Sequence, residues 1–442
     1  MDRRARIAGR TAFGGASRAV RRALAIALLA LLPSAGPART FGLPASSEYK
    51  GEIRRDPEGR LSVVESGRTL AGTAGASRPA TLKVGPGERV RTIGEAAEIA
   101  RDGDVVEILP GDYRGQPAVW TQNELTIRGG GERPVLFADG RNVEGKALWI
   151  VRGGAIHIEN LEFRGARVPD GNGAGIRFER GRLSIHRCAF VDNEMGLLTG
   201  NSPELSLEIS DSEFSDAPRH DGALHHLLYV GAIDRFVLTG SRFSNGYRGH
   251  LVKSRARENH VRYNLLADGP EGRASYELEF PNGGLAHVVG NVIAQSAATD
   301  NPILVAYGAE GRRWPDNALY FAHDTLIDAR RQGGTLLKLW ADEFPDGMEV
   351  WILNNLIVGA GESGLHPPPR GRFEGNRSAP ESALIEFAGL PVRLKPDDPL
   401  RGSVRVPGAA RGEALWPDAE FTLPAGQRPI RPGRALAPGA FQ

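Results

Sequence analysis

The chain has 442 residues, a formal net charge of +2 and a single cysteine, Cys188. Residues 1–38 hold seven arginines, so the remainder has a net charge of about −4, and charge gives no argument for nucleic-acid binding. One cysteine excludes an intramolecular disulfide. The folded protein must therefore be stabilised by packing.

Residues 1–38 have the features of an export signal. An arginine-rich lead is followed by the apolar run ALAIALLALL at 23–32 and by small residues suited to cleavage near Ala38. The run is shorter than the roughly 20 residues that span a bilayer, and no later segment approaches that length. We expect a protein exported to the periplasm or the extracellular space, without a membrane span.

The next segments predict a lead-in and a cap. Residues 39–80 are rich in small and charged residues and indicate a flexible lead-in. The stretch VRTIGEAAEIARDGDVVEILPGDYRG at 90–115 then predicts a short helix, begun by a capping box of Thr92 and Glu95 and followed by a strand. The apolar stripe expected on this helix consists of Ile93, Ala96, Ala97 and Ile99.

An internal repeat dominates the middle of the chain. Eight segments align without gaps: IHIENLEF (156–163), LSIHRCAF (183–190), LEISDSEF (207–214), FVLTGSRF (236–243), NHVRYNLL (259–266), AHVVGNVI (286–293), LYFAHDTL (319–326) and VWILNNLI (350–357). Their starts are about 23 to 33 residues apart, a period typical of solenoids. Short strands at this spacing indicate the coils of a parallel β-helix, stacked at about 4.8 Å.

One position of the repeat predicts a ladder inside the solenoid. Asn264, Asn291 and Asn355 share the sixth position, beside a bend. Inward asparagines there can hydrogen-bond from coil to coil and satisfy buried turn backbone. Cys188 lies in the same column and is interpreted as a small core residue.

Both ends of the chain resemble a known superfamily. The helix, strand and PGDY turn at 90–115, together with the terminal ALAPGAFQ, resemble secreted right-handed parallel β-helix proteins of the pectate-lyase-like superfamily. The resemblance implies an all-β, right-handed parallel β-helix over residues 81–390. Residues 391–442, rich in Pro, Gly and Arg, are then expected to form an extended wrap or tail.

The strand before each repeat segment carries the candidate site. If Leu228, Val252 and Leu278 point inward, strand alternation predicts an outward column of three neighbouring residues on successive coils. That column consists of Tyr229, Lys253 and Glu279. Residues expected beside it are Arg255, Glu277, His226 and His250.

The same region resembles polysaccharide lyase family six, the alginate lyase and chondroitinase B type. The stretches KSRARENHVRYN and SYELEFPNGG carry the resemblance, and the family motif is matched by Lys253, Ser254, Asn259, Arg262 and Asn264. Glu279 stands where the family has its catalytic arginine. The resemblance implies an acidic polysaccharide as partner and removal of the C5 proton of a uronate, aided by cations or a metal.

The presence of Glu279 changes the predicted roles. A carboxylate beside Lys253 stabilises its ammonium and raises its pKa, so Lys253 is predicted to clamp a substrate carboxylate, with Tyr229 or His226 as base. Arg255 completes the predicted catalytic set. The predicted substrate-binding residues are His250, Glu277, Glu279 and Tyr307.

Several alternatives remain at this stage. In one, calcium held by Glu277, Glu279 and Asn282 reverses the sign of the local electrostatic field. In another, Lys253 and Glu279 form an ordinary cross-strand ion pair with a structural role only. His260 and His287, outward beside Tyr320 and Trp351 on a second sheet, are interpreted as ordinary surface.

Three functional hypotheses follow from these residues. The first is a uronan lyase or C5 epimerase, since both begin with the same proton abstraction. The second is a glycoside hydrolase that uses Glu277 and Glu279 as its two carboxylates. The third is a β-helix that binds polysaccharide without catalysis. A monomer is expected in each case.

Overall fold

The computed structural model describes residues 52–55, 61–64, 79–220, 222–359, 365–368, 370–431, 433 and 436–442. The predicted export signal lies outside these residues. Contacts divide the chain into two units, Met1–Ala76 and Ser77–Gln442. In the first, β1 (Glu52–Arg55) and β2 (Leu61–Val64) form an antiparallel pair within the predicted lead-in. No helix in the described ranges is long and apolar enough to cross a membrane.

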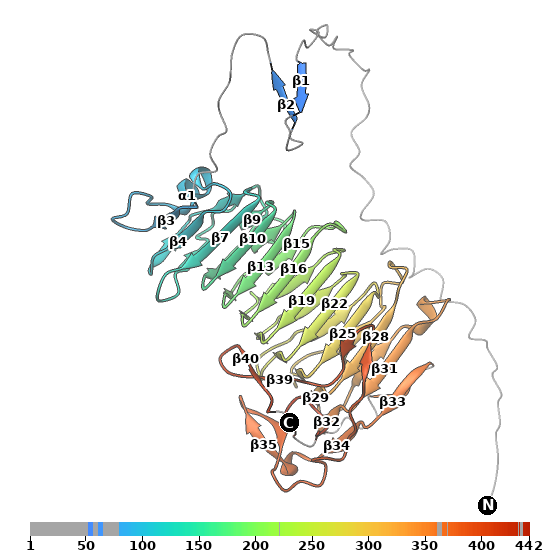
Figure 1. The fold of residues 1–442 in the computed structure, drawn as a ribbon. Coiled ribbons are helices and arrows are strands. Elements are labelled where there is room, and N and C mark those ends of the chain that lie inside the picture. The colour runs from blue at the N-terminus through green and yellow to red at the C-terminus, as the bar shows by residue number, and fades with distance from the viewer. Residues whose placement is uncertain are drawn as a thin grey trace, which may run out of the picture. The chain divides into compact units, whose positions relative to one another are not determined.

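The second unit is the predicted right-handed parallel β-helix. Three parallel sheets run along it, and each complete coil contributes a strand to sheet III, then to sheet I, then to sheet II. Figure 1 shows the strands stacked in succession from the end that carries α1. Equivalent residues of successive coils therefore lie in columns along the solenoid.

The strands of each sheet have the following bounds. Sheet I contains β3 (Thr81–Val84), β4 (Val105–Ile108), β7 (Glu124–Gly129), β10 (Ala155–Glu159), β13 (Arg182–His186), β16 (Ser206–Ser210), β19 (Arg235–Thr239), β22 (Glu258–Arg262), β25 (Leu285–Val289), β28 (Ala318–Ala322), β31 (Glu349–Leu353) and β33 (Gly371–Glu374). Sheet II contains β5 (Asp112–Arg114), β8 (Val135–Phe137), β11 (Glu162–Arg164), β14 (Ala189–Val191), β17 (Glu213–Ser215), β20 (Arg242–Ser244), β23 (Leu265–Ala267), β26 (Val292–Gln295), β29 (Thr325–Asp328), β32 (Leu356–Gly359) and β34 (Arg377–Ala379). Sheet III contains β6 (Ala118–Trp120), β9 (Ala147–Val151), β12 (Ala174–Phe178), β15 (Met195–Thr199), β18 (Leu228–Val230), β21 (Val252–Ser254), β24 (Leu278–Phe280), β27 (Ile303–Tyr307) and β30 (Thr335–Leu339).

The capping helix forms where the sequence predicts it, as α1 (Ile93–Ile99). The Thr92 hydroxyl accepts the backbone N–H of Glu95 at 3.2 Å, which confirms the N-cap. One member of the predicted apolar stripe is wrong, because Ile99 is 41% exposed. The buried face continues at Ala100 instead, seven residues after Ile93, as helical periodicity requires.

Each repeat segment spans two strands joined by a sharp bend. The bend falls at the fifth position, which has a left-handed φ of 50° to 72° in all eight copies. Only two of these residues are glycine, so the other six hold a conformation that L residues seldom adopt. The eight residues are Asn160, Arg187, Asp211, Gly240, Tyr263, Gly290, His323 and Asn354.

The predicted asparagine ladder is confirmed inside this bend. Asn264 Nδ2 donates to Asn291 Oδ1 at 2.9 Å, and Asn355 Nδ2 donates in the same way to Asn376 at 2.9 Å. The prediction from the three asparagines did not include Asp324, which lies between Asn291 and Asn355 in this column. Asp324 accepts a hydrogen bond from Asn291 Nδ2 at 2.9 Å. Burial raises the pKa of Asp324 to about 8, so this carboxyl is largely protonated at neutral pH.

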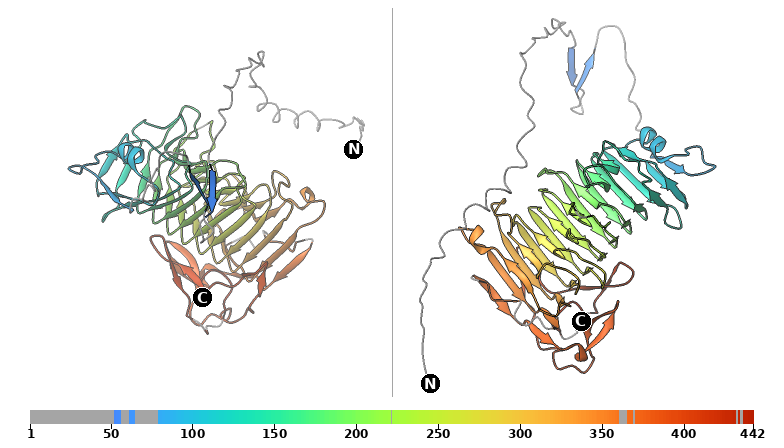
Figure 2. Two further views of the ribbon diagram at one scale, coloured as in Figure 1. Left: turned by 45° about the horizontal axis from the view of Figure 1, so that its top comes forward. Right: turned by 180° about the vertical axis from the view of Figure 1, so that it is seen from behind.

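The C-terminal extension packs against the last coils rather than hanging free. It begins before the predicted boundary at residue 391, directly after the last coil strand, with β35 (Leu384–Phe387) and β36 (Leu390–Leu394). The strands that follow are β37 (Ala409–Ala410), β38 (Glu413–Ala414), β39 (Ala419–Phe421) and β40 (Gln427–Pro429). Leu415 belongs to an apolar cluster on sheet I that includes Tyr320, while Phe441 belongs to one on sheet II that includes Val292. Figures 1 and 2 show this segment along the solenoid at the end opposite α1. Neither cluster includes a described residue of sheet III.

Candidate functional site

The predicted outward column on sheet III is in register. Lys253 pairs with Tyr229 on one side and with Glu279 on the other. Their strand neighbours Val252 and Leu278 are fully buried in the core, as alternation requires. The three coils therefore bring a phenol, an ammonium and a carboxylate side by side.

Lys253 and Arg255 are held between two carboxylates. Lys253 Nζ lies 3.1 Å from Glu279 Oε2 and 2.9 Å from Glu310 Oε1. Arg255 contacts the second oxygen of Glu310, and its Nε donates to Asn282 Oδ1 at 3.0 Å. The cluster thus combines two cations with two anions.

These partners set the protonation states. Burial lowers the pKa of Lys253, but Glu279 and Glu310 more than offset this and leave the pKa above its ordinary value. Burial raises the pKa of Glu279, yet His250 and Lys253 bring it below the ordinary range. At neutral pH Lys253 is an ammonium and Glu279 a carboxylate.

The ring of Tyr229 lies close to both cations, Lys253 and Arg255. Its ring centre is 5.1 Å from Arg255 Cζ and 6.0 Å from Lys253 Nζ, and the side chain is half-buried. Trp314 Nε1 donates to the backbone oxygen of Arg255 at 3.0 Å and so fixes the end of this strand. The phenol is the most exposed member of the column.

Two neutral histidines support the column from the start of the strands. His250 Nε2 lies 3.0 Å from Glu279 Oε2, and His226 Nδ1 accepts the backbone N–H of His250 at 2.9 Å. Burial lowers the pKa of both imidazoles, well below the ordinary value for His226. His226 therefore carries its proton on Nε2, and its acceptor nitrogen is already occupied.

Two predicted substrate-binding residues face the wrong way. Glu277 and Tyr307 are both fully buried, so their predicted place on the outer face is wrong. Tyr307 pairs with the buried Phe280, and its hydroxyl donates to the Gly284 oxygen at 2.6 Å. Glu277 occupies a corner where strand alternation breaks and the equivalent residue of the preceding coil is the core residue Leu251.

Most of the matched lyase motif is structural. Ser254 Oγ donates to Asn259 Oδ1 at 2.5 Å, and both side chains are fully buried. Asn264 belongs to the ladder, and Arg262 donates to Glu413 of the C-terminal extension at 3.1 Å. Of the five matched residues, only Lys253 belongs to the outward column.

The calcium set suggested by the sequence does not assemble. Glu277 lies in the core, whereas Glu279 faces outward from the same strand. Asn282 Oδ1 is already the acceptor for Arg255. Within the described ranges no group of three or more His, Cys, Asp or Glu residues has the geometry of a metal site. We therefore assign no chemical step to calcium.

Glu310 is the member of the cluster that sequence reasoning missed. It follows β27 in the turn YGAEG at 307–311, and it reaches Lys253 across 57 residues of sequence. The only signal was a glycine-flanked polar turn next to the predicted face. Such a turn does not reveal which partner its side chain meets.

A hollow with a volume of about 520 Å³ lies beside the same corner of the solenoid. One of its lining residues, Ser275, precedes Tyr276, whose ring lies 4.8 Å from that of His250. The hollow is lined by Leu224, Tyr247, Arg248, Arg273, Ser275, Thr299, Asp300 and Asn301. Its lining thus includes charged residues of both signs, two arginines and Asp300.

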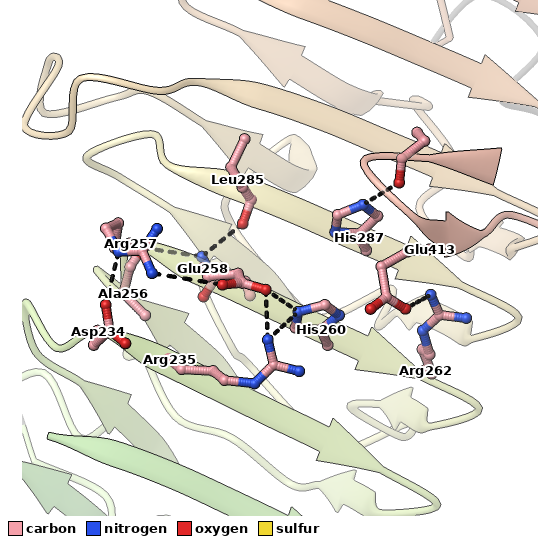
Figure 3. Close-up of polar contacts among 12 residues, drawn as sticks. Asp234, Arg235, Ala256, Arg257, Glu258, His260, Arg262, Leu285, His287 and Glu413 are labelled. Carbon is pink, nitrogen blue, oxygen red and sulfur yellow. Dashed lines mark hydrogen bonds and ion pairs between the residues drawn. The ribbon is translucent and has the colours of Figure 1, made fainter.

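A second polar cluster lies on the outer face of sheet I (Figure 3). His260 Nε2 contacts Glu258 Oε1 at 2.7 Å, and the His287 ring stacks on His260 at 5.1 Å. His287 Nε2 donates to the Ala410 oxygen at 3.3 Å. Both imidazoles are buried and His287 contacts the C-terminal extension, so their interpretation as ordinary surface is wrong.

Comparison with known proteins identifies the fold class. No protein-family model matches the chain, and no curated protein sequence does so. The crystal structure of pectate lyase Pel9A matches with a TM-score of 0.53 and 12% identity, over 79% of this chain and 98% of that one. A family PL6 polysaccharide lyase from Pseudopedobacter saltans matches with a TM-score of 0.33 and 12% identity, over 68% of this chain and 92% of that one, too low to add support. The chain therefore shares the parallel β-helix fold of pectate lyase Pel9A.

Proposed function

We propose that this is an exported protein that removes the C5 proton of a uronate unit in an acidic polysaccharide, as a lyase or an epimerase. The observation that carries the proposal is the half-buried phenol of Tyr229 beside the cations of Lys253 and Arg255. A uronate carboxylate bound to those cations would lose charge density, which acidifies the adjacent C5 proton. We assign the role of base to Tyr229, acting as its phenolate.

The neighbouring groups fit this assignment. Lys253 is paired with carboxylates and has a raised pKa, so it suits binding a carboxylate better than accepting a proton. His226 has no acceptor nitrogen to spare, because Nδ1 already accepts a backbone N–H. We therefore give the role of base to Tyr229, and we give His226 and His250 the role of positioning residues behind Glu279.

The carboxylate of Glu279 is compatible with an anionic substrate. It is 3% exposed, its charge is neutralised by Lys253, and it lies 3.0 Å from Nε2 of the neutral His250. It therefore holds the Lys253 ammonium in place without presenting free negative charge. The adjacent hollow, which is lined by Arg273 as well as by Asp300, offers polar groups for further units of a polymer.

The direct test is exchange of the C5 hydrogen with solvent. Alginate, pectate and glycosaminoglycans are incubated with the protein in D₂O, and deuterium at C5 is measured by NMR together with the ultraviolet absorbance of unsaturated product. A lyase gives absorbance, and an epimerase gives deuterium without absorbance. Absence of both on every acidic glycan would contradict the proposal.

Lys253→Ala provides the matched variant. We expect its turnover to fall at least about a hundredfold, because the ammonium is lost from the carboxylate site. Lys338→Ala is the control, since Lys338 lies further along the same outward column and is exposed. Turnover that survives in Lys253→Ala would remove Lys253 from the mechanism.

A second candidate is glycoside hydrolysis by a different pair of carboxylates. The burial of Glu277 removes the pair considered from sequence, but Glu279 and Glu310 contact the same ammonium from two sides. Two neighbouring carboxylates are the usual requirement of a glycosidase. New reducing ends without unsaturated product and without C5 deuterium would favour this candidate.

A further inference from the structure

Glu310 is much more exposed to solvent than Glu279, the other carboxylate that contacts Lys253. The Glu310 side chain is 41% exposed, whereas Glu279 is 3% exposed. Its backbone is fixed, because its N–H donates to the Pro281 oxygen at 2.8 Å. Rotation of the side chain alone would therefore withdraw the carboxylate into solvent and leave the turn in place.

The cations paired with Glu310 are mostly buried. The Lys253 side chain is 10% exposed and that of Arg255 is 17% exposed. Arg255 Nη1 is buried and has no hydrogen-bond partner among the described residues. With Glu310 withdrawn, the two cations would keep only the carboxylate of Glu279, which leaves a surplus positive charge.

We propose that the Glu310 carboxylate occupies the place of the substrate carboxylate on Lys253 and Arg255, and that a uronate displaces it on binding. This inference rests on the function proposed above and specifies its selectivity. A neutral sugar brings no charge to replace that of Glu310, so the cations remain closed to it. An acidic sugar replaces one carboxylate with another and restores the charge balance.

The test compares the affinity of two isosteric variants for defined sugars. Glu310→Gln removes the competing charge, and Glu343→Gln removes an equal charge from an exposed residue that flanks the same turn at Gly311. Isothermal titration is carried out with tetrasaccharides of galacturonate, mannuronate and guluronate, and with neutral cellotetraose. We expect Glu310→Gln to bind the best uronate tetrasaccharide about tenfold more tightly than the wild type.

The outcomes separate this inference from the proposed function. Tightening in Glu310→Gln, but not in Glu343→Gln or with cellotetraose, supports the inference. If the wild type binds a uronate tetrasaccharide and the two variants bind it equally well, displacement of Glu310 is wrong while the proposed function stands. If neither the wild type nor Glu310→Gln binds any uronate tetrasaccharide, both are wrong.

Discussion

Sheets I and III present similar columns to their outer faces, yet the two columns are covered differently. On sheet I, His260 and His287 stack toward Tyr320 beneath the C-terminal extension, whose backbone at Ala410 accepts from His287. On sheet III, Lys253 pairs with the side chain of Glu310, which is 41% exposed. The same strand alternation thus yields a buried ring stack on one face and, on the other, an ion-paired cluster that includes a partly exposed carboxylate. Under the function proposed above, this difference separates a column that serves stability from one that serves chemistry.

The largest effect is expected on the sheet III face. Tyr229→Phe removes the proposed base and should lower turnover about a thousandfold, with the melting temperature unchanged. Tyr320→Phe is the matched control on sheet I, where the hydroxyl donates to Glu349 at 2.6 Å. Steady-state kinetics of both variants tests the comparison. A similar loss of turnover in both would contradict it.

The next effect is expected under the C-terminal extension. Phe441 is 4% exposed and packs on Phe387 at 5.2 Å, so Phe441→Ala should lower the free energy of unfolding by about 3 kcal/mol. Urea denaturation measures this loss. Val406→Ala, at a 61% exposed position of the same segment, should change it by less than about 0.5 kcal/mol. Loss of turnover per folded molecule in Phe441→Ala would show that the two regions are coupled.

A smaller effect, a gain in stability, is expected when Asp324 of the asparagine ladder is replaced by Asn. The pKa of Asp324 is raised from 3.8 to about 8, so ionisation costs the folded state more than the unfolded one. Wild-type stability should therefore fall as pH rises from about 4 to about 8. Asp324→Asn continues the amide ladder, lacks this fall, and should be more stable at pH 7 by about 2 kcal/mol. Thermal unfolding at several pH values checks this, and a difference that grew toward acid pH would contradict it.

The smallest effect at neutral pH is expected in the buried histidine stack. Burial lowers the pKa of His287 from 6.5 to about 4, so wild-type stability should be lost as pH falls through this window. His287→Gln should cost about 1 kcal/mol at pH 7 through loss of the stack, yet reduce the loss on acidification. His157→Gln, with a 39% exposed side chain on the same sheet, is the control for melting temperatures at pH 7 and pH 5. Equal pH profiles for the two variants would contradict the prediction.

The sequence determined those features that depend on local pattern. The repeat predicts the solenoid because one coil cannot bury its apolar face alone. Alternation places Tyr229, Lys253 and Glu279 on one column, and the sixth repeat position predicts the asparagine ladder, both of which the structure confirms. These features follow from residues close in sequence, whose geometry is nearly fixed by strand and turn conformation.

Only the tertiary structure decided what happens at corners and between distant segments. Glu277 is buried because two successive residues face inward at its corner, which period-two alternation does not foresee. Glu310 meets Lys253 over 57 residues, and Tyr263 meets Asp418 over 155. Such contacts depend on how loops and the C-terminal extension fold back over the coils. No local periodicity carries that information, which is why the sequence predicted the column but not the groups that cover it.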